Sequence, residues 1–394
     1  MHYDHRFFDE PIDRRGTACE KWDGIAHREG MELLPMWVAD MDFRCPEVVT
    51  EALQKRVSHP VYGYTEETPA QVEAMLGFFR RRHGITLTAE QKYTLPCVVT
   101  GLYAAVRAFT KPGDSVILQS PVYGPFFRAI EGTGRLIADN ALLRDSEGRY
   151  IMDFEGLEAL CAGGAKLMLL CSPHNPTGRC WSREELTRLW SILNRYGVAL
   201  VSDEIHWDFV YEKGALTSVL ALAEAQDGSA PIMTITSASK SFNLAGLLQA
   251  VLLTRNGEMM TAVTTELKNT GTTQGNLFSL LAAEAVYREG DDWLDGLMDY
   301  LTTSRSILLE ELAVRLPRAV VSPIQATYLA WIDLRAYGFS GEELVRRTYA
   351  QGVAFTEGTF FGKEAGEGFL RLNFACPHSQ LKEAIIRLEK AIKD

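Results

Sequence analysis

Three short apolar segments of the sequence are each followed within a few residues by a polar side chain that can take part in catalysis. The pairs are residues 166–171 with Asn175, residues 198–202 with Asp203, and residues 231–236 with Lys240. Continuous apolar runs separated by helical segments are typical of a mostly parallel sheet that is covered on both faces. Ligands bind to such sheets beyond the carboxyl ends of the strands. We therefore expect an amide, a carboxylate and an amine to meet at one edge of one sheet.

Each of these residues, taken alone, has an ordinary structural explanation. Asn175 opens an Asn-Pro-Thr-Gly sequence that makes a good turn. An aspartate at a strand end, such as Asp203, often caps the next helix, and serine-rich loops like the one before Lys240 are common. A shared site is favoured because all three residues arrive at the same sheet edge from separate strands.

An amine, a carboxylate and an amide are the groups that pyridoxal 5'-phosphate (PLP) requires of a protein. The amine of Lys240 can form an imine with the cofactor, and the carboxylate of Asp203 can keep the pyridine nitrogen protonated, so that the ring accepts electrons from the substrate's α-carbon. The amide of Asn175 can donate to the phenolic oxygen, while serine hydroxyls and helix N-terminal amides suit the phosphate. The sequence thus favours a PLP enzyme that acts on an amino acid.

The remaining sequence predicts a large α/β domain and a smaller α+β domain. Further strands are expected at residues 115–119 and 248–254 and a helix at 183–195, where Ser182 and Glu185 have the spacing of a capping box. After about residue 290, apolar residues recur at helical spacing. Two short strands and a last helix follow at 328–333, 369–374 and 378–392. The expected division is an N-terminal segment (1–45) that joins the small domain, a large domain (46–288) and a small C-terminal domain (289–394).

Composition and charge limit the partners of the chain. The net charge of −11 disfavours nucleic acid, because phosphate binding requires clustered lysine and arginine. We expect no membrane span, since no run of about 18 apolar residues occurs, and the N-terminus lacks the pattern of a signal peptide. Seven cysteines, an odd number, favour free thiols in the cytoplasm. Cys171, His174 and Cys180 lack a fourth zinc ligand at standard spacing, so no metal is expected.

Several motifs carry a resemblance to a known family. Residues 172–178, 202–206, 236–243 and 371–375 resemble the fold-type I PLP enzymes of the class I/II aminotransferase group. Residues 13–17 (Asp-Arg-Arg-Gly-Thr), 21–23 (Lys-Trp-Asp), 36–43 and 326–333 look like the cystathionine β-lyase, or cysteine-conjugate C–S lyase, branch. The resemblance runs from about residue 5 to residue 390. It implies a PLP-dependent transferase-like fold and a homodimer with shared active sites.

The resemblance also implies the roles of residues around the cofactor ring and the substrate. Lys240 would form the Schiff base and remove the α-proton, and Asp203 would pair with the pyridinium nitrogen. Asn175 would donate to the phenolic oxygen, and Tyr123 would stack on the ring unless it is a core tyrosine. Arg371 would bind the α-carboxylate in a bidentate pair, the alternative being a salt bridge on the surface.

At the phosphate end, the resemblance points to Ser237, Ser239 and the backbone amides of Val98 and Val99. Tyr64 matches a tyrosine that reaches the phosphate of the neighbouring subunit.

The chain departs from the family's usual sequence at three places. Leu248 stands where many aminotransferases carry an arginine that holds the phosphate. Cys97 and Thr100 stand where the lyase branch usually has glycine and proline, at the phosphate end of the site. His206 takes the place of a tyrosine near the phenolic oxygen, which fits the lyase branch, although a packed histidine is an alternative. Trp37, in the lyase-like segment, is expected to contact the substrate.

The expected reaction is β-elimination from a small amino-acid substrate, a cysteine thioether such as cystathionine, which yields pyruvate, ammonia and a thiol. One alternative is an aminotransferase on the same fold. A second is a PLP-fold protein that acts as a regulatory or interaction module, against which the intact set of Lys240, Asp203 and Arg371 argues. The sequence does not indicate which thioether is preferred.

Overall fold

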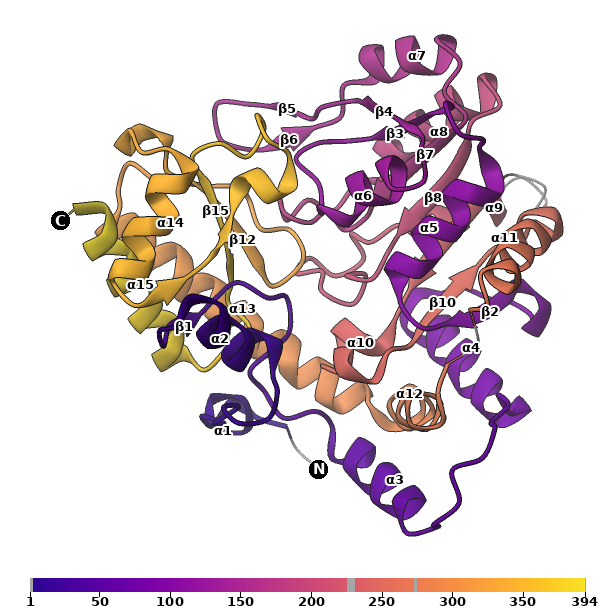
Figure 1. Cartoon of the computed structure of the whole chain (residues 1–394), viewed down its shortest axis with the longest axis horizontal. Coiled ribbons are helices and arrows are strands. Elements are labelled where there is room, and N and C mark those ends of the chain that lie inside the picture. Colours follow the sequence, from indigo (N-terminus) through magenta and orange to yellow (C-terminus); the bar gives the residue numbers. More distant parts are fainter. Residues whose placement is uncertain (1–2, 225–230, 273–274, 394) are drawn as a thin grey trace.

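The computed structural model describes residues 3–224, 231–272 and 275–393 of the chain. Its largest unit is a seven-stranded sheet flanked by helices (Figure 1). The strands, in their order across the sheet, are β2 (Lys92–Leu95), β10 (Ala250–Leu253), β9 (Ile232–Thr236), β8 (Ala199–Asp203), β7 (Leu167–Cys171), β3 (Ser115–Leu118) and β4 (Leu136–Asp139). The five strands from β9 to β4 are parallel, and β10 runs antiparallel to both of its neighbours. The mostly parallel sheet predicted from the apolar runs is therefore confirmed.

Helices cover both faces of this sheet, which explains why the central strand β7 is apolar and buried at every position. One face packs on α5 (Val98–Phe109), α6 (Pro125–Glu131) and α11 (Gly257–Asn269), and the other on α7 (Phe154–Ala162), α8 (Arg183–Arg195) and α9 (Val219–Glu224). Successive side chains of a strand point to opposite faces. Accordingly Leu167 and Leu169 join the first core, while Met168 and Leu170 join the second.

The predicted capping box begins α8. The Ser182 hydroxyl accepts a hydrogen bond from the Glu185 amide at 3.2 Å, and the Glu185 carboxylate accepts one from the Ser182 amide at 2.8 Å. Two of the amides at the helix start are thereby satisfied. The helix then places its apolar side against β7 and β8.

A second, four-stranded antiparallel sheet is formed by the C-terminal part of the chain. Its strands, in order, are β11 (Val320–Val321), β12 (Leu329–Asp333), β15 (Phe369–Asn373) and β14 (Thr356–Glu357). The accompanying helices are α13 (Asp291–Arg315), α14 (Gly341–Ala350) and α15 (His378–Lys393). The strands and the last helix predicted for this region are confirmed.

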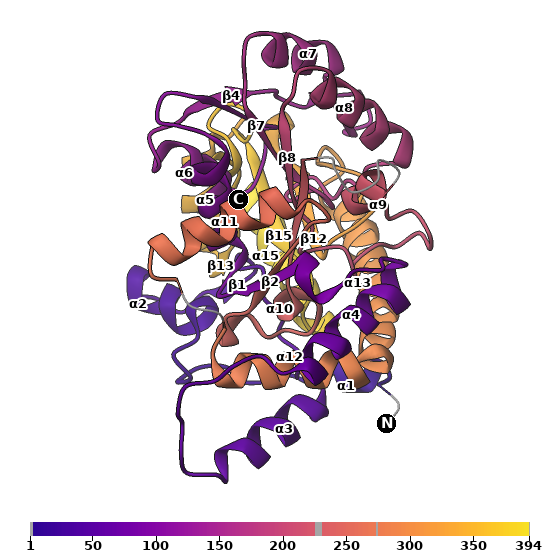
Figure 2. The same ribbon diagram turned by 90° about the vertical axis from the view of Figure 1, so that its right-hand side faces the viewer.

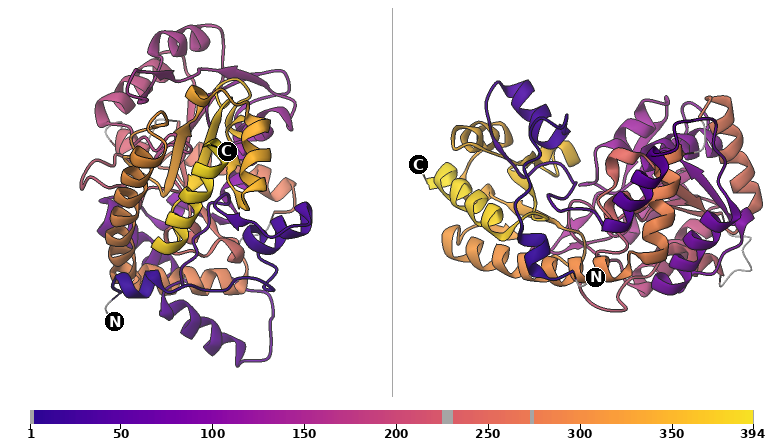
Figure 3. Two further views of the ribbon diagram at one scale, coloured as in Figure 1. Left: turned by 90° about the vertical axis from the view of Figure 1, so that its left-hand side faces the viewer. Right: turned by 90° about the horizontal axis from the view of Figure 1, so that it is seen from below.

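The N-terminal segment lies against this C-terminal unit (Figure 3). Its strand β1 (Leu34–Pro35) pairs in parallel with β13 (Val353–Ala354), and Phe8 shares a core with Leu370. The predicted domain boundary near residue 289 lies at the end of α12 (Leu277–Glu289). Where the domains divide stays a prediction.

Other elements lie outside the two larger sheets. They are α1 (His5–Asp9), α2 (Ile25–Glu29), α3 (Glu47–Val57), α4 (Pro69–His83), the hairpin β5 (Leu143–Arg144) and β6 (Tyr150–Ile151), and α10 (Ala238–Ser241). Helices α3 and α4 both pack on α12, and the segment that joins α3 to α4 runs along the outside of the molecule (Figure 2). Among the described residues, no helix is both long and apolar enough to cross a membrane.

Candidate active site

A cavity of about 480 Å³ lies beyond the carboxyl ends of β7, β8 and β9, between the two sheets. Ten of the residues singled out in the sequence line it: Trp37, Val98, Val99, Tyr123, Asn175, Asp203, His206, Ser239, Lys240 and Arg371. A cavity of similar volume, about 500 Å³, runs along α4 but contains none of them. The chemistry-bearing residues therefore gather in one place, as the strand-end argument predicts.

Lys240 lies in the short helix α10, directly after β9. Ser237 begins this helix, because its hydroxyl accepts a hydrogen bond from the Ser239 amide at 2.9 Å. The Lys240 amine donates to the carbonyl of Ala39 at 2.6 Å. Burial lowers the pKa of Lys240 to about 8. A substantial fraction of the amine is therefore neutral near physiological pH, as a nucleophile or a base must be.

Asp203 is the last residue of β8 and is almost completely buried. Its Oδ1 accepts a hydrogen bond from the Ile205 amide at 3.1 Å. Burial raises the pKa of Asp203 to about 7, although that hydrogen bond and the charge of Lys240 oppose the shift. A carboxylate in this situation is stabilised by a cationic partner such as a protonated pyridine nitrogen.

His206 lies three residues beyond Asp203 and lines the same cavity. Burial, with the charges of Lys240 and Arg371, lowers the pKa of His206 to about 3, so its ring is neutral. Its Nδ1 is buried and has no hydrogen-bond partner among the described residues. The ring nitrogen is thus available to a ligand.

Arg371 enters the site from β15 of the small sheet. Its Nη1 donates to Asn175 Oδ1 at 3.2 Å, and its Nη2 donates to the carbonyl of Trp37 at 2.6 Å and to Thr356 Oγ1 at 3.1 Å. Burial lowers the pKa of Arg371 to about 10. Within the described parts of the chain it contacts no carboxylate, and its Nε has no partner. A buried guanidinium without an anion is a binding site for one.

Tyr123 lies between β3 and α6, with its ring 6.1 Å from that of Phe360. Burial raises the pKa of Tyr123 above its ordinary value, against the opposing charge of Arg371. The hydroxyl is therefore protonated at physiological pH, and the ring faces the cavity where a planar cofactor would stack.

Helix α5 opens onto the same cavity. It begins at Val98, and its N-cap Cys97 accepts no hydrogen bond from the backbone amides of the first turn, because its Sγ pairs with Thr100 Oγ1 at 3.2 Å. The amides of Val98 and Val99 are therefore open to an anion, which the helix dipole also favours. Leu248 lines the cavity where many aminotransferases carry an arginine, so it supplies no charge there.

Two residues singled out in the sequence do not line this cavity. The Ser237 hydroxyl donates to the carbonyl of Gln249 while it caps α10, so its hydrogen-bonding capacity is used inside the protein. Tyr64 lies in the segment between α3 and α4, and its side chain is fully exposed. Neither residue contacts a ligand position within a single chain.

Several cavity-lining groups have no signal in the sequence reasoning. They are the Ala39 carbonyl, Thr356, Phe360, Glu20 and Arg128. A backbone carbonyl has no residue-type signature, and the others lie in short helices or strands outside the recognised motifs. Tyr328, which also donates to the Ala39 carbonyl at 2.9 Å, stands in the segment 326–333 and could have been singled out there.

The donor set fits PLP. The cavity offers an amine for its aldehyde, a buried carboxylate for its pyridine nitrogen and an open helix N-terminus for its phosphate. No group of three or more histidine, cysteine, aspartate or glutamate side chains in the described ranges could hold a metal ion.

Comparisons with known proteins agree with this geometry. The family described as aminotransferase class I and II matches residues 34–388. The cystathionine β-lyase PatB of Bacillus subtilis is 39% identical over 98% of this chain and 99% of its own length. The protein MalY of Escherichia coli is 33% identical over 98% of both chains. The crystal structure of cystalysin from Treponema denticola, which contains a PLP cofactor, matches all of both chains with a TM-score of 0.94 and 33% identity.

Proposed function

The chain belongs to the aminotransferase class I and II family, and from this premise we propose that it is a PLP-dependent carbon–sulfur lyase. Its substrates are cysteine thioethers, and the products are a thiol, pyruvate and ammonia. The observation that carries the proposal is the gathering of Lys240, Asp203 and Arg371 in one cavity, where Asp203 and Arg371 are buried charged groups that a ligand would balance and Lys240 is a half-buried amine. Relatives of similar length that carry the name cystathionine β-lyase support the same reaction.

We assign the cofactor to the residues described above. Lys240 holds its aldehyde carbon, Asp203 its ring nitrogen, and the amides of Val98 and Val99 its phosphate. When bound, PLP supplies an electron sink for the negative charge that develops at the substrate's α-carbon. Asp203 maintains this capacity, because a buried carboxylate stabilises a proton on the ring nitrogen.

The substrate is held by Arg371 and deprotonated by Lys240. Two nitrogens of the Arg371 guanidinium bind the α-carboxylate in a bidentate pair, for which Nη2 exchanges its contact with Thr356 Oγ1 for the substrate. The pair fixes the α-carbon relative to the lysine. The amine of Lys240, which is free once the substrate's amino group has taken its place, accepts the α-proton at Nζ. Loss of the β-thiolate follows, and the carbon–sulfur bond breaks with its electron pair on sulfur. The remaining fragment takes up water and releases pyruvate and ammonia.

We further propose a homodimer in which Tyr64 reaches the phosphate of the partner's site. The support is its exposure, since the tyrosine lies on the surface of its own chain, away from the cavity. The small-domain division at residue 289 and a cytoplasmic location also stay proposals. All seven cysteines lie in the described part of the chain and are free thiols, as a reducing compartment requires.

An aminotransferase on the same fold is the second candidate, because the family includes such enzymes. His206, in place of a tyrosine near the phenolic oxygen, favours the lyase. The two reactions differ after the α-proton is removed: a lyase expels the thiolate, whereas an aminotransferase transfers the amino group to a keto acid.

The deciding experiment supplies purified holoenzyme with L-cystathionine or an S-alkyl cysteine and no keto acid. Thiol, pyruvate and ammonia should appear in equal amounts. Alanine, which has no leaving group, should react slowly at most. A requirement for a keto acid, with no thiol released, would refute the lyase assignment.

A further inference from the structure

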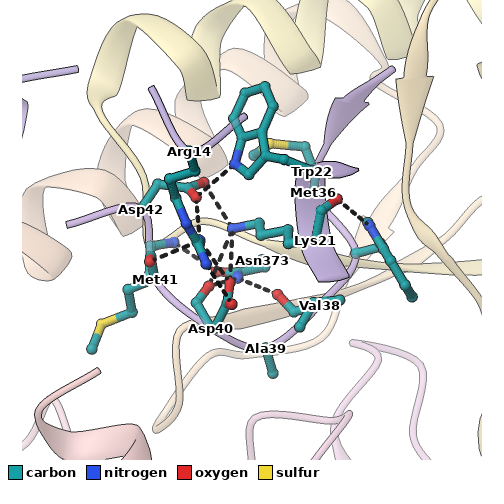
Figure 4. Close-up of polar contacts among 12 residues, drawn as sticks. Arg14, Lys21, Trp22, Met36, Val38, Ala39, Asp40, Met41, Asp42 and Asn373 are labelled. Atoms are coloured by element: carbon teal, nitrogen blue, oxygen red, sulfur yellow. Dashed lines mark hydrogen bonds and ion pairs between the residues drawn. The ribbon is translucent and has the colours of Figure 1, made fainter. Parts of the chain in front are cut away.

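Four charged residues from three motifs of the N-terminal segment have no part in the function as proposed, yet they come together in the folded chain. Arg14 belongs to the first of them, Lys21 to the second, and Asp40 and Asp42 to residues 36–43. Figure 4 shows these four side chains pointing toward one another. We call the four residues the charge cluster.

Hydrogen bonds join the two cations of the charge cluster to its two carboxylates. Arg14 binds Asp40 with both ends of its guanidinium, at 3.0 and 2.8 Å, and donates to Asp42 Oδ1 at 2.7 Å. Lys21 Nζ donates to Asp42 Oδ2 at 2.7 Å and to the carbonyl of Asp40 at 3.1 Å. Burial alone would raise the pKa of Asp42, but the charges of Lys21 and Arg14 hold it below its ordinary value.

Two members of the charge cluster are deeply buried, which argues for more than a contribution to stability. The side chains of Lys21 and Asp42 are only 1% and 2% exposed. Removing two charges from water costs several kcal/mol per ion, and an apolar pair of the same size is often as stable. The best-documented role of buried ion pairs is to favour one arrangement of the chain over others.

The arrangement selected here is that of residues 37–41, whose carbonyls receive hydrogen bonds from the active-site cations. The carbonyl of Trp37 accepts from Arg371 Nη2 at 2.6 Å. The carbonyl of Ala39, next to Asp40, accepts from Lys240 Nζ at 2.6 Å and from the Tyr328 hydroxyl at 2.9 Å.

Two asparagines, one near each active-site cation in sequence, form hydrogen bonds with the same segment. Asn373, two residues from Arg371 in β15, donates to the carbonyls of Val38 and Asp40, both at 2.6 Å. Asn243, three residues beyond Lys240, accepts from the amide of Met41 at 3.0 Å and donates to its carbonyl at 2.9 Å. The segment is therefore tied to both catalytic elements and to the charge cluster.

We propose that the charge cluster positions Lys240 and Arg371 for the reaction. By fixing residues 37–41, it holds the Ala39 carbonyl in place. This carbonyl accepts a hydrogen bond from the Lys240 amine when that amine is not covalently bound. It also holds the Trp37 carbonyl that orients the guanidinium. The inference rests on the proposed function, since it takes Lys240 to be the reacting amine. Arg14, Lys21, Asp40 and Asp42 are positioning residues and do not touch the substrate.

The cluster also sets part of the electrostatic field at the lysine. The groups that face Lys240 are Asp40 and Lys21 from the N-terminal segment, Asp203 and His206 from the end of β8, Arg371 from β15, and Tyr328 through the shared carbonyl. Burial is the main cause of the low pKa of Lys240; Asp40 and Asp203 raise that pKa, and Arg371 and Lys21 lower it. Two members of one cluster thus act in opposite directions.

The test uses this opposition of sign in the holoenzyme. Asp40→Asn removes a negative charge, so the midpoint of a pH titration of the visible absorption should fall. Lys21→Gln removes a positive charge, so the midpoint should rise. We expect shifts of roughly half a pH unit, below the 1 to 3 units that a contacting charge produces. Should the Lys21 variant fail to fold, Arg14→Gln removes the same sign of charge and should also raise the midpoint.

A matched control separates positioning from general damage. Arg14 is 22% exposed and pairs with two carboxylates; Arg315 is 30% exposed and pairs with Glu311 and Glu389 at 2.7 and 2.8 Å. Arg14→Gln should raise KM and lower kcat/KM about tenfold, the size of effect that one weakened charged hydrogen bond at the substrate would have. Arg315→Gln should change neither KM nor the titration midpoint.

Damage to the fold would move both midpoints in the same direction. Shifts of one sign in the Asp40 and Lys21 or Arg14 variants, or none, would overturn the inference. A wild-type protein without any visible band that borohydride abolishes would instead refute the proposed role of Lys240, and the inference with it.

Discussion

Replacing Arg371 by lysine tests how the proposed site recognises its substrate. The change keeps one positive charge but removes the planar fork. In the native protein Nη2 is held by the Trp37 carbonyl at 2.6 Å and by Thr356 at 3.1 Å, and Nη1 donates to Asn175 at 3.2 Å. An ammonium group cannot keep such contacts and also bind a carboxylate through two parallel hydrogen bonds.

The magnitude follows from the number of hydrogen bonds lost. A hydrogen bond to a charged group is worth about 1.5 to 3 kcal/mol. Losing one of two such bonds to the α-carboxylate lowers kcat/KM by about 10- to 150-fold, since 1.4 kcal/mol is a factor of ten. The loss should appear mainly in KM, because the carboxylate is bound equally in the ground state and the transition state.

The assay is the steady-state release of thiol from an S-alkyl cysteine and from the same compound with its carboxylate replaced by a carboxamide. Arg371→Lys should impair the first reaction and leave the already slow second reaction little changed. Arg144→Lys is the control, since Arg144 is 20% exposed, pairs with Asp333 at 2.8 Å and lies outside the cavity. Equal losses with both substrates would show that Arg371 does not bind the carboxylate.

Three further predictions concern the cofactor, pH and assembly. Lys240→Ala should abolish the visible band that borohydride removes from the wild-type protein; a reduced cofactor found on another residue would contradict this assignment. In the cofactor-free protein, the raised pKa of Asp203, about 7 when folded against about 3.9 when unfolded, means that the folded state binds the extra proton between these values. The free energy of unfolding should therefore fall as the pH rises from about 4 to 7. Denaturant titrations of Asp203→Asn should show a shallower fall, and an unchanged slope would exclude Asp203 as the group responsible. Mixing Lys240→Ala subunits with subunits of a Tyr64→Phe variant of low activity should restore part of the activity, because some heterodimers contain one intact site; no gain after subunit exchange would mean that each site is built from one chain.

Much of the large domain could be predicted because its physical causes are local. The apolar runs form strands whose side chains are buried on both faces of the sheet by helices. The Ser182–Glu185 capping box begins α8 where its spacing indicates. Asn175, Asp203 and Lys240 meet because parallel strands end at the same edge of a sheet. The family resemblance of the motifs was confirmed by the match over residues 34–388.

The sequence itself thus determined the strands, the side chains at their ends and the class of chemistry these side chains support, because periodicity and residue type carry that information. Tertiary structure alone decided that Arg371 lies beside Asn175, 196 residues away in the chain, and that Lys240 donates to Ala39, 201 residues away. It also decided that Ser237 caps α10 and bonds Gln249 inside the protein. The physical reason is that every residue has a carbonyl oxygen, so its type does not reveal which carbonyl will accept a hydrogen bond. Only the packing of the N-terminal segment between the two sheets brings Ala39 to the lysine.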